Sequence, residues 1–194
     1  MKKSAIKNFF PKAKLVVKKA NNREVREGWL FLDGKRWRIR NGILIAPHFS
    51  DAIQKEQKAI KIIDKKADLG GNISGKKEDF FEALASLPEG KTNNPYFQNA
   101  GAFLNISLGK KDYQDFLKSL KGKLKILELG ADSGWSAAKL SKNHEVMALD
   151  VSDHLFFRDF WLEHKSFFEA VMVDMHELPF RNECFDLVFA IAAI

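Results

Sequence analysis

The sequence predicts an α/β protein whose C-terminal part, residues 123–194, forms a doubly wound and mostly parallel sheet. Two observations support this fold class. Short apolar runs alternate in this region with segments of helical pattern, which is the order of elements in a parallel sheet. The first run, residues 124–129, also leads directly into a glycine loop and then a helix over residues 135–141. This strand, loop and helix are typical of a Rossmann-like fold.

The composition is that of a folded, globular chain. Its 194 residues are 45% hydrophobic and include 17 Phe and 4 Trp, enough core material to exclude a disordered chain. The single cysteine, Cys184, excludes a disulfide scaffold, and the five histidines show no paired-ligand spacing, so no metal site is expected. No apolar run approaches the roughly 20 residues of a membrane span. We therefore expect a cytoplasmic protein without a membrane partner.

Charge is divided unevenly along the chain. Residues 1–42 contain 13 Lys and Arg but only 3 Asp and Glu. Residues 126–194 contain 5 Lys and Arg and 12 Asp and Glu. The most basic segment, residues 1–22, is interpreted as an N-terminal arm. Such an arm could bind the phosphates of a nucleic acid in a salt-dependent way, or it could be a solvated tail.

The next two segments are interpreted as accessory regions. Residues 23–49 predict a small β-meander, because Asp33-Gly34 and Asn41-Gly42 favour tight turns and apolar residues alternate with arginines over residues 35–40. Residues 50–122 predict a helical and irregular connection. We expect one helix from Ser50 to the glycines at 70–71, a second over 77–87, an irregular stretch over 88–108 and a third helix over 112–120.

The glycine loop carries the prediction of a ligand site. Gly130 allows a tight turn directly after the first strand, and Gly134 allows a close approach of the following helix and of a ligand. Asp150 follows Gly130 by twenty residues, at the end of the next strand. A carboxylate at that spacing suits hydrogen bonds from both hydroxyls of a ribose, so the loop is predicted to bind a nucleoside cofactor.

Further motifs lie at matching positions downstream. A third strand over residues 171–173 ends in Asp174, a short Leu-Pro-Phe motif follows at 178–180, and a fourth strand begins at Phe185-Asp186. Together with residues 126–134 and 148–150, these motifs resemble class I S-adenosylmethionine-dependent methyltransferases. The resemblance covers residues 123–194, the predicted cofactor-binding domain.

The resemblance implies a role for each matching residue. Glu128 and Gly130 would border the methionine part of S-adenosylmethionine, and Gly134 would line the loop. Asp150 would bind the ribose, while the Asp174 carboxylate and the Met175 backbone amide would contact the adenine. The implied cofactor-binding residues are Glu128, Gly130, Asp132, Gly134, Asp150, Asp174 and Met175.

Asp132 stands where family members usually have a glycine. Aspartate is among the residues that tolerate a left-handed backbone, so the turn can form. Its carboxylate would repel the pyrophosphate of a dinucleotide, but it would face cationic groups of S-adenosylmethionine. Asp132 therefore favours the methyl donor over NAD.

The predicted function is methyl transfer to an unknown acceptor. No motif that would orient a nucleophile is visible in residues 190–194, and the histidines, His154 among them, are interpreted as surface or loop residues, so no catalytic residue is assigned. Because the chain stops after the fourth strand, we expect a C-terminally truncated domain whose activity is open. The alternative is a non-catalytic nucleoside- or RNA-binding module that uses the basic arm. A third hypothesis is an NAD-dependent oxidoreductase, but the Asp132 carboxylate would disfavour binding of NAD.

Overall fold

The computed structural model describes residues 1–66, 77–89 and 109–191. The chain divides into two compact units. The first combines Met1–Gln57 with Leu124–Ala193, and the second is built from Lys58–Lys123. The predicted boundaries after residues 22 and 49 both fall inside the first unit.

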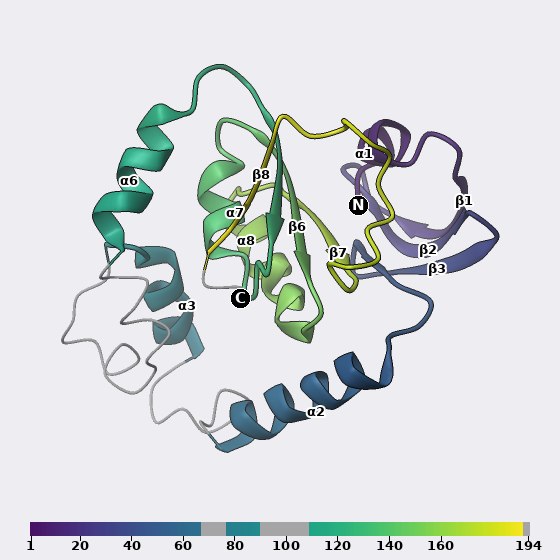
Figure 1. Cartoon of the computed structure of the whole chain (residues 1–194), viewed down its shortest axis with the longest axis horizontal. Helices are drawn as coiled ribbons and strands as arrows, with labels where there is room; N and C mark the ends of the chain where they lie inside the picture. The colour runs from purple at the N-terminus through teal and green to yellow at the C-terminus, as the bar shows by residue number, and fades with distance from the viewer. Residues whose placement is uncertain (67–76, 90–108, 192–194) are drawn as a thin grey trace. The chain divides into compact units, whose positions relative to one another are not determined.

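The C-terminal part of the first unit has the predicted α/β arrangement (Figure 1). Its four strands are parallel and lie in the order β7-β6-β5-β8, so the chain starts in the middle of this region and moves outward to both sides. This is the strand order of a Rossmann-like half. The elements are β5 (Lys125–Leu129), α7 (Trp135–Leu140), β6 (Glu145–Asp150), the 3-10 helix η1 (Asp153–Phe157), α8 (Arg158–Glu163), β7 (Glu169–Met172) and β8 (Leu187–Ala190).

The N-terminal strands belong to the same sheet. The predicted meander is confirmed as antiparallel pairing of neighbouring strands, and the turns at Asp33-Gly34 and Asn41-Gly42 have the expected positive φ angles. The last strand of the meander then pairs in parallel with β7, which makes one eight-stranded sheet in the order β1-β2-β3-β4-β7-β6-β5-β8. The elements are α1 (Lys3–Phe9), β1 (Lys14–Ala20), β2 (Val25–Leu32), β3 (Lys35–Arg40) and β4 (Ile43–Ile45).

The basic arm of residues 1–22 is folded, which corrects the expectation of a solvated tail. Helix α1 buries Ala5, Ile6 and Phe9, and β1 pairs with β2 along its length. Phe9 stacks on Phe185 with ring centroids 5.1 Å apart. The lysines of this segment face solvent and hide its apolar periodicity in the sequence, while the aromatic contacts that fix it come from residues more than 170 positions away.

A buried ion pair ties the N-terminal strands to the cofactor-binding half of the sheet. Arg158, only 1% exposed at the start of α8, donates to Glu24 Oε2 at 2.6 Å and to the Phe168 carbonyl at 2.7 Å. Burial opposes ionisation of Glu24, but Arg158 and the N-terminal ammonium together outweigh it and lower the pKa of that carboxyl to about 2. Arg26 forms a second link, a bidentate pair with Asp159 at 2.7 Å.

The remaining helices follow the predicted pattern. Helix α2 (Asp51–Lys66) begins in the first unit, where the Ser50 hydroxyl caps it by accepting from the Ile53 amide at 3.3 Å. The second unit contains α3 (Lys77–Ser86) and α6 (Lys110–Ser119). Most of the stretch predicted to be irregular, residues 90–108, lies outside the described residues. Among the helices that are described, none is long and apolar enough to cross a membrane.

Candidate functional site

The loop after β5 has the conformation that its glycines require. Gly130, Asp132 and Gly134 have φ angles of 67°, 46° and 78°, so Asp132 does adopt the left-handed backbone. The Ala131 amide donates to the Leu149 carbonyl at 2.9 Å, and the Gly134 amide donates to the Ala131 carbonyl at 2.8 Å. These bonds hold the loop against the end of β6.

Two aromatic side chains fix the far end of the loop. A Cβ atom on Gly134 would lie 2.6 Å from Cζ of Phe168, so a glycine is needed there for space as well as for its φ angle. The Trp161 indole N–H donates to the Ser133 carbonyl at 2.7 Å. The sequence predicts a close approach of the following helix and of a ligand at Gly134, and the structure adds a contact with the ring of Phe168 that the sequence does not predict.

Glu128 is a buried carboxyl group inside β5, with only 3% of its surface exposed. The Ser136 hydroxyl and the Ala137 backbone amide bond to it, but among the described residues Oε2 has no hydrogen-bond partner. Burial and the nearby charges of Asp150 and Asp132 raise the pKa of Glu128 to about 8. An unpaired buried carboxyl oxygen is unfavourable unless a ligand supplies a donor.

Asp150 holds the loop in place at the end of β6. Its Oδ2 accepts from the Asp132 amide at 2.7 Å, and its Oδ1 accepts from the Ser152 amide at 2.8 Å. A carboxylate has about four acceptor sites, so two remain for a ligand. The predicted ribose-binding residue thus also orients the loop.

His154 contacts the candidate site, and sequence reasoning missed it. Its Nδ1 contacts Oδ1 of Asp132, and its ring stacks on Phe157 with centroids 5.6 Å apart. Partial enclosure opposes ionisation of Asp132, but His154 and the Ser133 amide outweigh it and hold the pKa of Asp132 below its ordinary value. The signal in the sequence was the replacement of a family glycine by aspartate, with a histidine four positions after Asp150.

The two residues predicted to contact adenine follow the next strand. In the parallel pairing of β6 with β7, Asp150 lies opposite Met172, and the Val173 amide donates to the Asp150 carbonyl at 3.0 Å. Asp174 accepts from the His176 amide and from His176 Nδ1, which lowers the pKa of Asp174. Met175 is 36% exposed. The predicted site residues therefore lie at or near the carboxyl ends of the neighbouring parallel strands β5, β6 and β7.

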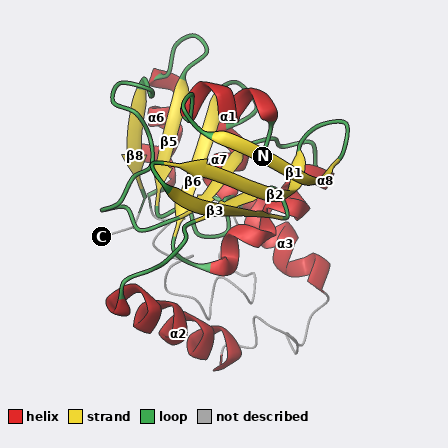
Figure 2. Ribbon diagram, turned by 90° about the vertical axis from the view of Figure 1, so that its right-hand side faces the viewer, coloured by secondary structure: helices red, strands yellow, loops and turns green. Residues whose placement is uncertain are grey.

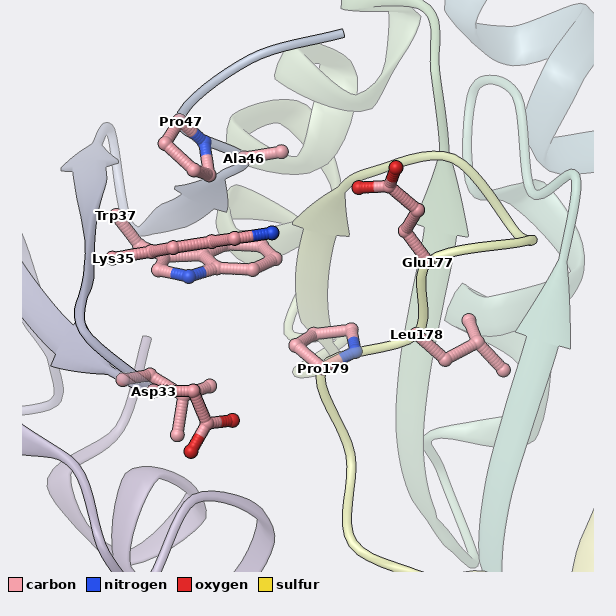
Figure 3. Close-up of a pocket in the computed structure, with 9 residues that line it drawn as sticks. Asp33, Lys35, Trp37, Ala46, Pro47, Glu177, Leu178 and Pro179 are labelled. Atoms are coloured by element: carbon pink, nitrogen blue, oxygen red, sulfur yellow. The ribbon is translucent and has the colours of Figure 1, made fainter. Parts of the chain in front are cut away.

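A pocket of about 240 Å3 lies beside the loop that follows β7. Figure 3 shows the Trp37 indole on one side of it and Glu177, Leu178 and Pro179 on the other. The predicted Leu-Pro-Phe motif is thus adjacent to the accessory strands. The lining residues are Leu32, Asp33, Lys35, Trp37, Ala46, Pro47, Glu177, Leu178 and Pro179.

This arrangement is a candidate ligand-binding site at the carboxyl ends of parallel strands, and comparisons with known proteins indicate the kind of domain that carries it. Residues 127–194 match the family model of a methyltransferase domain. The match indicates a class I S-adenosylmethionine-dependent methyltransferase domain in this segment, and S-adenosylmethionine is the cofactor of that family. No curated protein matches the chain.

Solved structures of methyltransferases are also similar to the chain. A candidate methyltransferase from Bacillus halodurans C-125 is 23% identical, with 41% of this chain and 37% of that chain covered and a TM-score of 0.38. A candidate S-adenosylmethionine-dependent methyltransferase from Methanococcus maripaludis is 15% identical. The similarity covers 58% of this chain and 50% of that chain, with a TM-score of 0.39. Magnesium protoporphyrin IX methyltransferase from Synechocystis PCC 6803 with bound SAH is 14% identical. The similarity covers 55% of this chain and 51% of that chain, with a TM-score of 0.38. The chain spans about half or less of the length of these proteins.

Proposed function

We propose that this chain binds S-adenosylmethionine at the loop after β5 and transfers its methyl group to an acceptor. The observation that carries the proposal is that the buried Oε2 of Glu128 has no hydrogen-bond partner within residues 1–66, 77–89 and 109–191. A buried carboxyl oxygen that receives no hydrogen bond from the described residues fits a site for a cationic ligand, and the amino acid part of the methyl donor carries an ammonium group. Glu128 thus fits the cofactor that the family indicates.

The other predicted residues have positions consistent with their roles. Asp150 has acceptor sites left for the two ribose hydroxyls after it has bound the Asp132 and Ser152 amides. Asp174 and Met175 follow the adjacent strand β7, on the side of Asp150 away from Glu128. A cofactor lying along this edge would place its methionine part over β5 and its adenine beside β7.

The chemistry asks the protein mainly to position the reactants. A bound sulfonium supplies an electrophilic methyl carbon, and its transfer to a nucleophile is an in-line displacement. The chain's contribution is then to hold the donor rigidly, to align an acceptor and to exclude water. The fixed backbone of Gly130, Asp132 and Gly134 suits the first of these tasks.

The pairing of the Asp132 carboxylate affects the choice between S-adenosylmethionine and a dinucleotide as the cofactor. Asp132 was expected to repel a dinucleotide pyrophosphate, but its carboxylate is paired with His154, and a protonated imidazole there would offset the negative charge. Asp132 alone therefore discriminates less than the sequence suggests. The preference for the methyl donor depends on Glu128 and on the family match.

Calorimetric titration of the purified, folded chain with S-adenosylhomocysteine tests the proposal, with NADH as the control ligand. We expect binding of S-adenosylhomocysteine and none of NADH. Asp150→Ala should weaken binding by about 1–3 kcal/mol through loss of charge-assisted hydrogen bonds. Asp51→Ala, which removes an exposed carboxylate at the start of α2, is the matched control. Equal affinities of the two folded variants would refute the role of Asp150.

A further inference from the structure

The three N-terminal strands present an open face that the methyl-donor site does not use. Strands β1, β2 and β3 lie side by side as an antiparallel unit (Figure 2). Leu30 and Trp37 point to the buried side, so their neighbours along each strand point outward. The outer face, named here the β1–β3 face, consists of Lys14, Val16, Lys18, Glu27, Trp29, Phe31, Arg36, Arg38 and Arg40.

Two aromatic rings lie at the centre of the β1–β3 face. Phe31 is 41% exposed although it lies within a strand. Trp29 is half-buried under two cations, with the Arg36 guanidinium 4.4 Å and the Lys18 ammonium 5.6 Å from its ring centroid. The pairing register places Phe31 between Lys14 and Arg36, and Trp29 between Val16 and Arg38. Flat rings therefore alternate with positive charges across three strands.

The cations of this face have no carboxylate partners among the residues that the structure describes. Within the described parts of the chain, no carboxylate forms an ion pair with Lys14, Lys18, Arg36, Arg38 or Arg40. The face contributes five positive side chains against the single carboxylate of Glu27. By contrast, Arg26 and Arg158, which lie near the other side of these strands, are paired with carboxylates.

We propose that the β1–β3 face binds single-stranded nucleic acid. Unpaired bases stack on exposed aromatic rings and on arginine guanidinium planes, and lysine and arginine contact the phosphates between them. Phe31 and the stacked Arg36–Trp29 pair supply the platform, and Lys14, Lys18 and Arg38 surround it with positive charge. The exposed sheet face accepts a flexible strand whose bases can turn toward it.

The proposal differs from the basic-arm hypothesis in the residues that it uses. Only Lys14 and Lys18 of the arm belong to the face, whereas Lys3 and Lys7 lie on α1. The arginines and rings come from β2 and β3. None of the residues of the β1–β3 face follows β5, β6 or β7, and Arg40 contacts an element of the cofactor-binding half, with its guanidinium 5.2 Å from the ring centroid of Phe156.

Fluorescence anisotropy with labelled oligouridylate and oligothymidylate of about twelve nucleotides tests the proposal. We expect both strands to bind, with log affinity falling against log salt at a slope between about −2 and −3.5 if three to five phosphates are contacted. The competitors are an RNA duplex, polyglutamate and vesicles containing phosphatidylserine. Competition by polyglutamate or by the vesicles as strong as that by the single strand would overturn the proposal in favour of an acidic protein or a membrane surface.

Substitutions separate stacking from charge. Phe31→Ala should weaken oligouridylate binding about tenfold, whereas Phe31→Tyr, which keeps the ring, should bind normally. The double variant Arg36→Gln and Arg38→Gln should reduce the salt slope by about 1.4, and Lys3→Gln with Lys7→Gln is the control of equal charge loss. Equal effects of the two double variants, or normal binding by folded Phe31→Ala, would contradict a specific face.

The outcome is independent of methyl-donor binding. Asp150→Ala should leave the affinity for oligouridylate unchanged, and Phe31→Ala should leave the titration with S-adenosylhomocysteine unchanged. Circular dichroism of each variant confirms that the sheet is intact. A failure of either proposal can therefore be recognised without the other.

Discussion

Replacing Glu128 by glutamine tests whether the carboxyl group at the centre of the site is held in its neutral form. Glutamine keeps the size of the side chain and one carbonyl oxygen but cannot ionise. In the wild type, burial and the charges of Asp150 and Asp132 raise the pKa of Glu128 from 4.5 to about 8. The substitution therefore removes a titration that occurs at an unusual pH in the folded protein.

The magnitude follows from the two pKa values. Between pH 4.5 and 8 the unfolded chain has lost the Glu128 proton and the folded chain retains it, so the free energy of unfolding falls as the pH rises. Each pH unit within this range lowers it by up to about 1.4 kcal/mol. The Glu128→Gln variant cannot ionise at this position and lacks this pH-dependent loss of unfolding free energy. Its stability relative to the wild type should thus improve by on the order of 3 kcal/mol between pH 5 and pH 8.

Urea unfolding of both proteins at pH 5, 6, 7 and 8, followed by tryptophan fluorescence, measures this difference. All other titrating groups are shared and cancel in the comparison. Glu163→Gln makes the same substitution at an exposed position of α8 and controls for the loss of one carboxylate. A difference between wild type and Glu128→Gln that stays constant over this pH range would refute the raised pKa.

Three further results are expected. The affinity for S-adenosylhomocysteine should increase by up to about tenfold per unit between pH 6 and 8, because pairing with its ammonium needs ionised Glu128; calorimetry at each pH checks this. Gly134→Ala should lower the free energy of unfolding by about 2 kcal/mol or more, measured in urea, and adding Phe168→Leu should restore only the part due to the clash. Arg158→Met should lower the free energy of unfolding by up to about 3 kcal/mol, because buried Glu24 loses one of its three cationic partners and keeps the Met1 ammonium and Arg26, and the double variant with Glu24→Gln should recover part of the loss in the same assay.

The sequence predicted those features that depend on local pattern. Strands that are buried on both faces appear in the sequence as continuous apolar runs. The predicted bounds of β5 and β6 therefore differ from the observed bounds by at most one residue. The turns at Asp33-Gly34 and Asn41-Gly42 could be predicted because few residue types accept their positive φ angles.

Contacts between distant segments could not be predicted. Helix α1 and β1 were missed because lysines obscure their pattern, and the rings that hold α1, Phe180 and Phe185, are far along the chain. The parallel pairing of β4 with β7 likewise joins strands more than 120 residues apart. A single sequence carries no local signal for such a pairing.

Within the candidate site, the sequence indicated residue types but not their partners. The left-handed conformation of Asp132 was expected and is present. Its contact with His154, and the unpaired Oε2 of Glu128, depend on how η1 and α7 pack around the loop. The roles of Glu128, Asp150, Asp174 and Met175 in cofactor binding stay predictions.

Parallel titrations of wild-type protein and Glu128→Gln with S-adenosylhomocysteine at pH 8 test the central claim most directly. Carried out in two buffers of different ionisation enthalpy, they report both affinity and proton release. We predict that the wild type binds and releases a fraction of a proton, and that the variant binds at least about tenfold more weakly without that release. Equal affinity and equal proton release in the two proteins would contradict the proposed site.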